Sequence, residues 1–138
     1  MFMNIKLDVG SYMPTRAHKT DAGLDLYSPI DTWIEPHNEC EIDTGVHLEL
    51  PKGTVGLVRS KSGLLFKYGI LTDGTIDEGY TGSIKIKLFN MRDQLYDIKK
   101  GEKIAQLVIV KCKKPRLLLT DVLKDTDRGD DGFGSTGK

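Results

Sequence analysis

Short runs of alternating apolar and polar residues, each ended by glycine, proline or aspartate, constrain this chain more than any other feature. The segment Ser83–Leu88 alternates strictly, with isoleucine and leucine on one face and lysine on the other. Alternation of this kind is typical of a β-strand, whose successive side chains point to opposite faces. Glu41–Leu50 also alternates, and Lys103–Val110 and Leu117–Val122 are further strand candidates. Only Leu64–Tyr68 suggests a helix, of one or two turns. The pattern predicts an all-β sandwich or barrel of short strands with at most one short helix.

The size and charge of the chain narrow its class further. At 138 residues it is expected to form one domain, residues 1–138. It carries 20 basic and 20 acidic residues, and this balance argues against a general binder of nucleic acid or of a membrane surface. Any anionic ligand must therefore be held by local donors rather than by the field of the whole protein.

Other features point to a cytoplasmic protein. The apolar runs are too short to span a bilayer, and the first residues lack the apolar block of a signal peptide. Cys40 and Cys112 form no cysteine-rich framework, so reduced thiols are expected. His18, His37 and His47 show no metal-ligand spacing.

The C-terminal segment Arg128–Lys138 combines an arginine, four glycines, one phenylalanine and a Ser-Thr pair, with no apolar face to pack. Glycines let backbone N–H groups converge on an anion, hydroxyls add donors, and arginine binds phosphate with two hydrogen bonds. We therefore interpret residues 125–138 as a flexible glycine-rich lid that closes over a phosphorylated ligand, on a body formed by residues 1–124. A solvated tail without function is the alternative. The matches to G-x-x-x-x-G-K and G-x-G-x-x-G are rejected, because no helix can follow them.

Two further clusters lie in the first half of the chain. Asp25 stands between Leu24 and Leu26, where a carboxylate faces solvent, meets a basic partner, or helps to hold a hydrated metal ion. The run Arg59–Leu64 places two cations and two hydroxyls immediately before the expected helix. That arrangement suits a phosphate site, although a charged turn is the ordinary alternative.

Two more clusters follow in the second half. In Gly74–Gly82, three glycines enclose two acids and Tyr80, which suits a tight hairpin whose backbone can read the edge of a base or hold a carboxylate near a ligand. An ordinary acidic hairpin is the alternative. Gln106 is a lone amide in an apolar strand, and if it faces inward a ligand or the backbone must satisfy it.

Taken together and in this order, the five clusters resemble the motifs of the trimeric dUTPase family. The segments Gly74–Gly82 and Gly132–Gly137 are the most specific, and the motifs are spread from Asp21 to Lys138. The resemblance implies a jelly-roll-like β-barrel and a homotrimer whose three active sites each take motifs from three subunits. It also implies hydrolysis of dUTP, with Mg²⁺, to dUMP and pyrophosphate, which limits uracil incorporation into DNA and supplies dUMP for dTMP synthesis.

By the same resemblance, Asp77 would be the general base, Tyr80 would lie under the deoxyribose, and the backbone of Gly74 and Ile76 would bind uracil. Asp25 would act through water on the Mg²⁺. Phe133 would stack on uracil. The phosphate chain would be bound by Lys61, Ser62, Gly63, Gln106, Arg128, Gly134, Ser135 and Thr136. One departure is clear: the family usually has arginine where this chain has Lys61, and lysine lacks the two-pronged fork.

The sequence also bears on three alternatives to a dUTPase. The related dCTP deaminases carry a catalytic glutamate at the position of Lys87, and a lysine cannot perform that proton transfer in the same way. A nucleotide-responsive regulatory protein on the same scaffold, with another protein as its partner, is the main alternative to an enzyme. A purely structural β-domain would require every cluster to be a coincidental turn.

Overall fold

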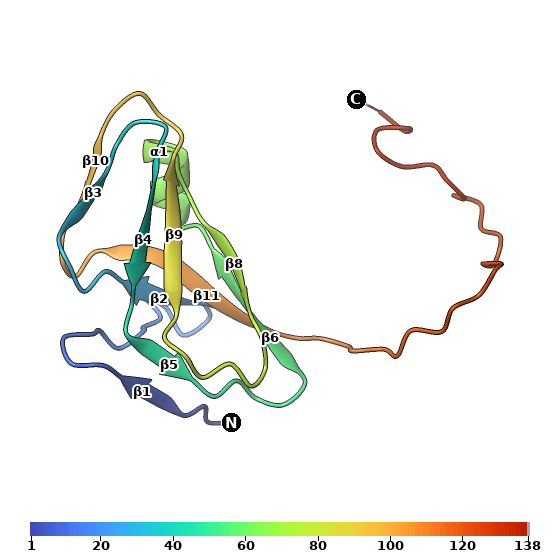
Figure 1. Cartoon of the computed structure of the whole chain (residues 1–138), viewed down its shortest axis with the longest axis horizontal. Helices are drawn as coiled ribbons and strands as arrows, with labels where there is room; N and C mark the ends of the chain where they lie inside the picture. Colours follow the sequence, from blue (N-terminus) through green and yellow to red (C-terminus); the bar gives the residue numbers. More distant parts are fainter. Residues whose placement is uncertain (138) are drawn as a thin grey trace.

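The computed structural model describes residues 1–137 and is built mainly of β-strands around one core. Four antiparallel sheets are present (Figure 1). The strands of the largest, in spatial order, are β2 (Gly23–Tyr27), β11 (Lys103–Lys111), β6 (Thr54–Arg59) and β8 (Asp73–Ile76). A three-stranded sheet contains β4 (Glu39–Asp43), β9 (Lys85–Asn90) and β7 (Ile70–Leu71). Two pairs complete the fold, β1 (Ile5–Leu7) with β5 (Val46–Leu48) and β3 (Thr32–Ile34) with β10 (Tyr96–Ile98).

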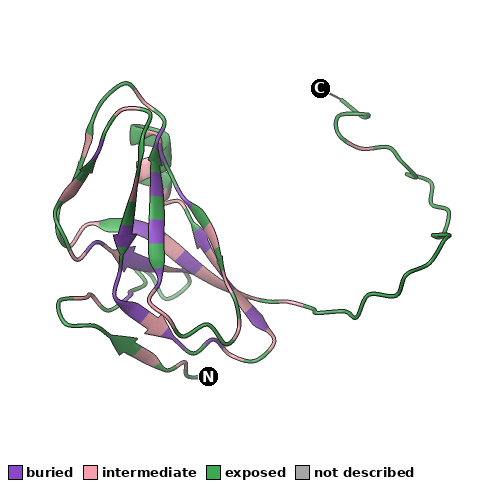
Figure 2. Ribbon diagram, viewed as in Figure 1, coloured by how far each residue is buried: buried purple, intermediate pink, exposed green. Residues whose placement is uncertain are grey.

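The two larger sheets enclose the core between them (Figure 2). Ile42, Ile86 and Leu88 come from the three-stranded sheet, and Leu26 and Leu107 from the four-stranded sheet. The expected all-β class with one short helix is confirmed, in a jelly-roll-like arrangement. Within residues 1–137 the sheets keep separate edges, so the strands do not close into a continuous barrel.

The strand predicted from strict alternation is present as β9. Ile84, Ile86 and Leu88 are each 1% exposed, whereas Lys85 and Lys87 face solvent. The predicted run Glu41–Leu50 is divided into β4 and β5 by a turn at Gly45, whose φ of +66° favours glycine. The Oγ of Ser11 lies 1.8 Å from the position that a Cβ at residue 45 would take, so a side chain there would also clash.

The helix α1 (Ser62–Tyr68) confirms the expected short helix and begins two residues before the predicted range. Gly69 ends it in the left-handed conformation, with φ of 61°. No helix among residues 1–137 is long and apolar enough to cross a membrane.

The predicted strand at Leu117–Val122 is wrong for the isolated chain. Regular structure ends at Lys111, and residues 113–137, which we call the C-terminal arm, run away from the sheets (Figure 1). Leu117, Leu118 and Leu119 are at least 90% exposed. A strand needs a neighbour to accept its backbone hydrogen bonds, and no strand among residues 1–137 lies beside the segment.

Candidate functional site

The glycine-rich cluster Gly74–Gly82 forms the end of β8 and the turn that follows it. A surface pocket of about 260 Å³ opens there, lined by Thr75, Ile76, Asp77, Tyr80, Ser83 and Lys85. The backbone N–H of Tyr80 donates to the Asp77 carbonyl at 3.1 Å, which closes the turn. The Tyr80 hydroxyl donates to the Ser83 carbonyl at 2.9 Å and fixes the ring against Gly82, where a Cβ would lie 2.5 Å from the hydroxyl. The predicted pair Asp77 and Tyr80 therefore share one pocket.

Asp77 and Glu78 differ in what holds them. The Glu78 carboxylate accepts from the Gly53 N–H at 3.0 Å and from Lys114, and these bonds, Lys114 first, lower its pKa. Within residues 1–137, no hydrogen bond engages the Asp77 carboxylate. Only Asp77 is thus left with its carboxylate available to a water molecule at the pocket.

A second group of predicted residues lies in one row across the four-stranded sheet. Gln106 on β11 is directly opposite Asp25 on β2 and Arg59 on β6, and Arg59 is opposite Asp73 on β8. Directly opposed residues in antiparallel strands point to the same face. The first, second and fourth motifs therefore meet on one side of the sheet.

The Gln106 side chain is oriented by its surroundings. Its amide N–H donates to the Ser60 carbonyl at 3.1 Å. Its Oε1 lies 2.2 Å from where a Cβ of Gly23 would be, so the glycine provides the space that the amide occupies. A surface pocket of about 590 Å³ is lined here by Arg59, Ser60, Leu65, Leu71, Thr72, Asp73 and Gln106. The Ser60 carbonyl thus satisfies one N–H of the Gln106 amide, and the Gln106 side chain also lines the neighbouring pocket.

Asp25 is buried and meets basic partners. Its side chain is 5% exposed, with one carboxylate oxygen bound to Lys61 and the other 3.0 Å from the Lys103 ammonium. Burial alone would raise the pKa of this carboxyl, but the hydrogen bonds from Lys61 and Lys103 outweigh burial and lower the pKa below its ordinary value of 3.8. Asp25 is therefore ionised at neutral pH and holds Lys61 at the start of α1.

Because the folded-state pKa of Asp25 is depressed, its contribution to stability is present above the unfolded pKa and is lost as the pH falls through the folded pKa. We expect Asp25→Asn to reduce the free energy of unfolding by about 2 kcal/mol at pH 7, the scale of hydrogen bonds to a charged group, since water screens the half-exposed Lys103. Urea unfolding at pH 7 and pH 3 measures this. An equal deficit at both pH values would contradict the assignment.

Ser62 and Gly63 begin α1, and Lys61 precedes them as its N-cap residue. They lie beyond one end of the β6–β8 pair, whereas Asp77 follows the other end of β8. Asp73 is opposite Arg59, so four residues of extended chain, about 13 Å, separate the row of Arg59 from Asp77. A single chain does not bring the predicted base together with the predicted phosphate contacts.

The predicted lid residues lie in the C-terminal arm, away from every other predicted site residue (Figure 1). Arg128, Gly134, Ser135 and Thr136 are exposed, and Phe133 is fully exposed with φ of 48°. Their hydrogen bonds are local, such as Arg128 Nε to the Asp131 carbonyl at 2.7 Å. Lys138, the last residue of the predicted lid, lies outside the described residues.

The donor set bears on the expected Mg²⁺. Residues 1–137 contain no cluster of three or more His, Cys, Asp or Glu side chains that could hold a metal ion. Asp25 is a lone carboxylate, and each of its oxygens already faces a lysine ammonium. Such a site fits a hydrated ion that is bound chiefly by a phosphorylated ligand, because Mg²⁺ keeps several waters and takes few carboxylates. It does not fit an ion held by the protein alone.

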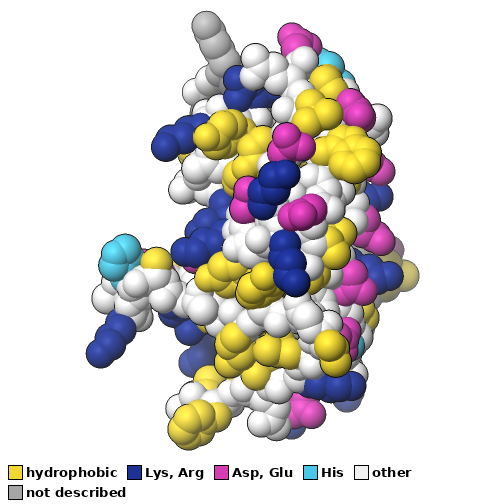
Figure 3. Space-filling view, turned by 90° about the vertical axis from the view of Figure 1, so that its left-hand side faces the viewer, with side chains coloured by type: hydrophobic (Ala, Val, Ile, Leu, Met, Phe, Trp, Pro, Cys, Tyr) yellow, Lys and Arg dark blue, Asp and Glu magenta, His cyan; other side chains and the backbone are white. Residues whose placement is uncertain are grey.

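Two parts of the site were missed by sequence reasoning. Lys103, three residues before Gln106 in the sequence, has no predicted role, although it pairs with Asp25. His47, which contacts the Thr81 carbonyl, and Asp8, which contacts His47, carried no signal, because 39 residues separate them along the chain. The face that carries β3 and β10 shows both signs of charge intermixed with apolar patches (Figure 3).

Comparisons with known proteins agree on one family. The family model for dUTPase matches residues 11–137. Curated relatives include the deoxyuridine 5'-triphosphate nucleotidohydrolases of Clostridium kluyveri and Rhodococcus erythropolis. They are 44% and 42% identical, over 96% of this chain and over 94% and 83% of the respective relatives.

Solved structures give the same result. A dUTPase of Staphylococcus bacteriophage 80alpha with dUpNHpp is 34% identical and has a TM-score of 0.93, with 99% of each chain covered. It is described among phage dUTPases that control the transfer of virulence genes. A mutant dUTPase of phage phi11 of S. aureus, described with a structural Mg(II) ion, is 31% identical, with a TM-score of 0.81 over 88% of this chain and 98% of that one.

Proposed function

The chain belongs to the dUTPase family, and we propose that it hydrolyses dUTP to dUMP and pyrophosphate with Mg²⁺. The observation that carries the proposal is the pocket shared by Asp77 and Tyr80, in which Asp77 is available while Glu78 is engaged elsewhere. Hydrolysis here would limit uracil incorporation into DNA and supply dUMP for dTMP synthesis. The cytoplasm is the expected location.

Asp77 would act as the general base. Its carboxylate would accept a proton from a water molecule whose oxygen attacks the α-phosphorus, and the bond from that phosphorus to the bridging oxygen of the β-phosphate would break. The products would be dUMP, pyrophosphate and the proton held by Asp77. Tyr80 would lie under the deoxyribose and leave no room for a 2′-hydroxyl.

Uracil would be recognised by the backbone of Gly74 and Ile76. Both residues belong to β8, the outer strand of its sheet, so backbone groups on its outer edge are available to a base. A backbone donor or acceptor opposite the wrong group of cytosine would remain unpaired. Sites of this kind discriminate by about 10⁴-fold or more.

The triphosphate would be bound at the start of α1 and at Gln106. Ser62, Gly63 and Lys61 would contribute donors, and Arg128, Gly134, Ser135 and Thr136 would add more when the arm closes and Phe133 covers the uracil. Mg²⁺ would neutralise charge on the phosphates, with Asp25 accepting a hydrogen bond from one of its waters. Before ligand enters, Lys61 is paired with Asp25, so it would have to reorient to reach a phosphate.

We propose that the active enzyme is a homotrimer with shared sites. The support is the separation within one chain: Asp77 lies at one end of the β6–β8 pair, Ser62 at the other, and the arm extends away from both. A second copy supplying the missing groups would complete each site.

Release of pyrophosphate from dUTP, UTP, dCTP and dTTP, each with Mg²⁺ and with excess chelator, tests the proposal. We expect release from dUTP alone, and only with the metal ion. Equal release from UTP would contradict the role of Tyr80, and equal release from dCTP would contradict the role of β8.

A regulatory role on the same scaffold is a second candidate. It is favoured by the likeness to the phage 80alpha dUTPase, which is described as acting in the control of gene transfer. A pull-down with and without dUpNHpp tests it. A protein captured in only one of the two conditions would support this role, alone or beside hydrolysis.

A further inference from the structure

We propose that Asp8 and His47 form a positioning link that holds the Thr81 carbonyl, and with it the turn Asp77–Thr81, in the shape that substrate binding requires. The proposal rests on the proposed function, because the turn carries both Asp77 and Tyr80. It assigns to His47 a role in affinity for dUTP and in its dependence on pH. His47 itself is not a catalytic residue.

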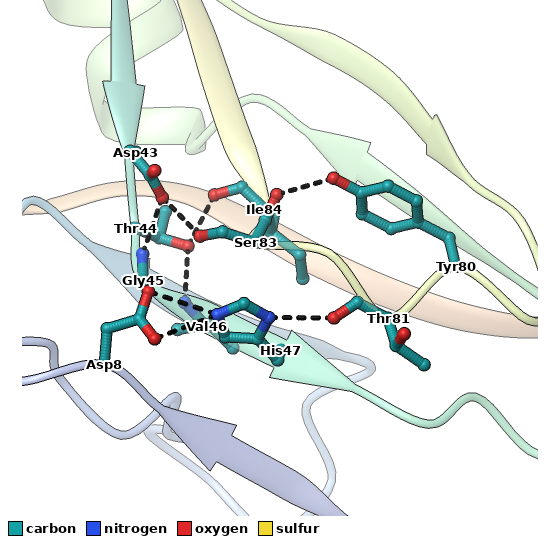
Figure 4. Close-up of polar contacts among 10 residues, drawn as sticks. All are labelled: Asp8, Asp43, Thr44, Gly45, Val46, His47, Tyr80, Thr81, Ser83 and Ile84. Carbon is teal, nitrogen blue, oxygen red and sulfur yellow. Dashed lines mark hydrogen bonds and ion pairs between the residues drawn. The ribbon is translucent and has the colours of Figure 1, made fainter.

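The link connects three separate parts of the chain (Figure 4). His47 lies in the middle of β5, and its side chain is 20% exposed. Its Nδ1 is 2.8 Å from the Thr81 carbonyl oxygen, and its Nε2 is 3.1 Å from both carboxylate oxygens of Asp8. The imidazole therefore bridges the segment after β1 and the turn after Tyr80.

Both partners of His47 can only accept hydrogen bonds. A neutral imidazole carries one N–H and can donate to only one of them, whereas the imidazolium donates to both. The geometry therefore favours the protonated ring. The carbonyl of Thr81 first, and then Asp8, raise the pKa of His47 above its ordinary value of 6.5.

The other charged groups around His47 do not reverse this preference. Lys6, opposite His47 on β1, opposes protonation, and Asp43 at the end of β4 interacts favourably with the charged ring. Glu49, which lines the same shallow surface pocket as His47, accepts a hydrogen bond from the Asn4 amide at 2.8 Å. Lys85 on β9 acts on Asp43 rather than on the ring.

The turn has a second anchor that does not titrate near neutrality (Figure 4). Tyr80 donates to the Ser83 carbonyl, the Ser83 hydroxyl donates to Asp43, and Asp43 also accepts from the Gly45 N–H at 3.0 Å. The Ser83 hydroxyl and then the Gly45 N–H lower the pKa of Asp43, so this anchor persists at every pH above the ordinary carboxyl range. Only the end held by His47 weakens as the pH rises.

The direction of the effect follows from the raised pKa. The contribution of His47 is fully present below its unfolded pKa of about 6.5 and is lost as the pH rises through its folded-state pKa. Above that point, a ring that keeps its N–H toward Thr81 turns a lone pair toward the Asp8 carboxylate. The turn then loosens, and KM for dUTP rises while kcat changes less.

Three variants test the link by KM and kcat from pH 5.5 to 9. His47→Ala should raise KM for dUTP roughly threefold to tenfold at pH 6, which corresponds to the free energy of one hydrogen bond. It should also remove the increase in KM that the wild type shows at alkaline pH. His47→Asn keeps a neutral amide donor toward Thr81, so its KM should vary little with pH. His37→Asn is the matched control, because His37 is also paired with an aspartate, Asp93, but lies on the far loop between β3 and β4.

Nuclear magnetic resonance of the ring nitrogens provides a readout that needs no turnover. We expect both nitrogens of His47 to be protonated at pH 6, and Asp8→Asn to lower the pH at which one proton leaves. A singly protonated His47 at pH 6, or a KM profile of His47→Ala that matches the wild type, would overturn the link. If the wild type releases no pyrophosphate from dUTP, the proposed function fails, and the nitrogen titration still decides the link.

Discussion

Asp77→Asn is expected to lower kcat for dUTP by about 10²-fold to 10⁴-fold while leaving binding of dUpNHpp nearly unchanged. The amide has almost the same shape as the carboxylate but cannot take a proton from the attacking water, and general bases contribute on this scale. Because no hydrogen bond within residues 1–137 engages the Asp77 carboxylate, the substitution should not disturb the turn. Single-turnover kinetics and calorimetric titration separate the two effects.

Glu78→Gln is the matched control, because it changes the neighbouring acid in the same way. Glu78 is turned to Gly53 and Lys114, so its loss should change kcat only slightly. The opposite result, in which Glu78→Gln loses turnover and Asp77→Asn keeps it, would exchange the roles of the two acids.

Removal of residues 128–138 should abolish most activity without loss of the fold. Arg128 and Phe133 would provide a charged phosphate contact and a stacked ring, and the loss of both corresponds to roughly 10²-fold or more in kcat/KM. Closure of the arm would also exclude water from the reacting phosphate. Since the hydrogen bonds of Arg128 and Gly129 stay within the arm, the thermal midpoint should not change.

Two point variants divide the contribution of the arm. Arg128→Lys keeps the charge but loses the fork, and Phe133→Leu keeps an apolar side chain but loses the stacking ring. Each should reproduce part of the loss. If the truncated protein instead unfolds at a lower temperature, the arm is structural and the lid interpretation is wrong.

Much of the fold followed from local pattern. The alternation of Ser83–Leu88 predicts β9 because one face of that strand is buried and the other is solvated, which is the condition under which alternation carries information. The strand predicted at Leu117–Val122 failed for another reason, because no partner strand lies beside this segment within residues 1–137. A strand forms only when a second segment pairs with it, and the sequence pattern of one segment does not show whether that second segment is present.

The site was less accessible to sequence reasoning than the fold. Thr75, Ile76, Asp77 and Tyr80 line one pocket, as expected of residues that are neighbours in sequence. The sequence allows solvent, a basic partner or a metal ion beside Asp25, because the lysines that surround it, Lys61 and Lys103, are distant from it along the chain. The contact between His47 and Thr81 depends on how β5 lies beside the turn, which no local pattern encodes.

The distance between Asp77 and Ser62 within one chain has a genetic consequence. If each site is assembled from several copies as proposed, a subunit with a damaged base still lends its phosphate-binding residues to a neighbour. Two differently damaged copies could then restore some sites between them, whereas one damaged copy would also impair sites in assemblies with normal partners. The severity of an inherited defect would then depend on which subunits are mixed in each assembly, and not only on how much intact protein is made.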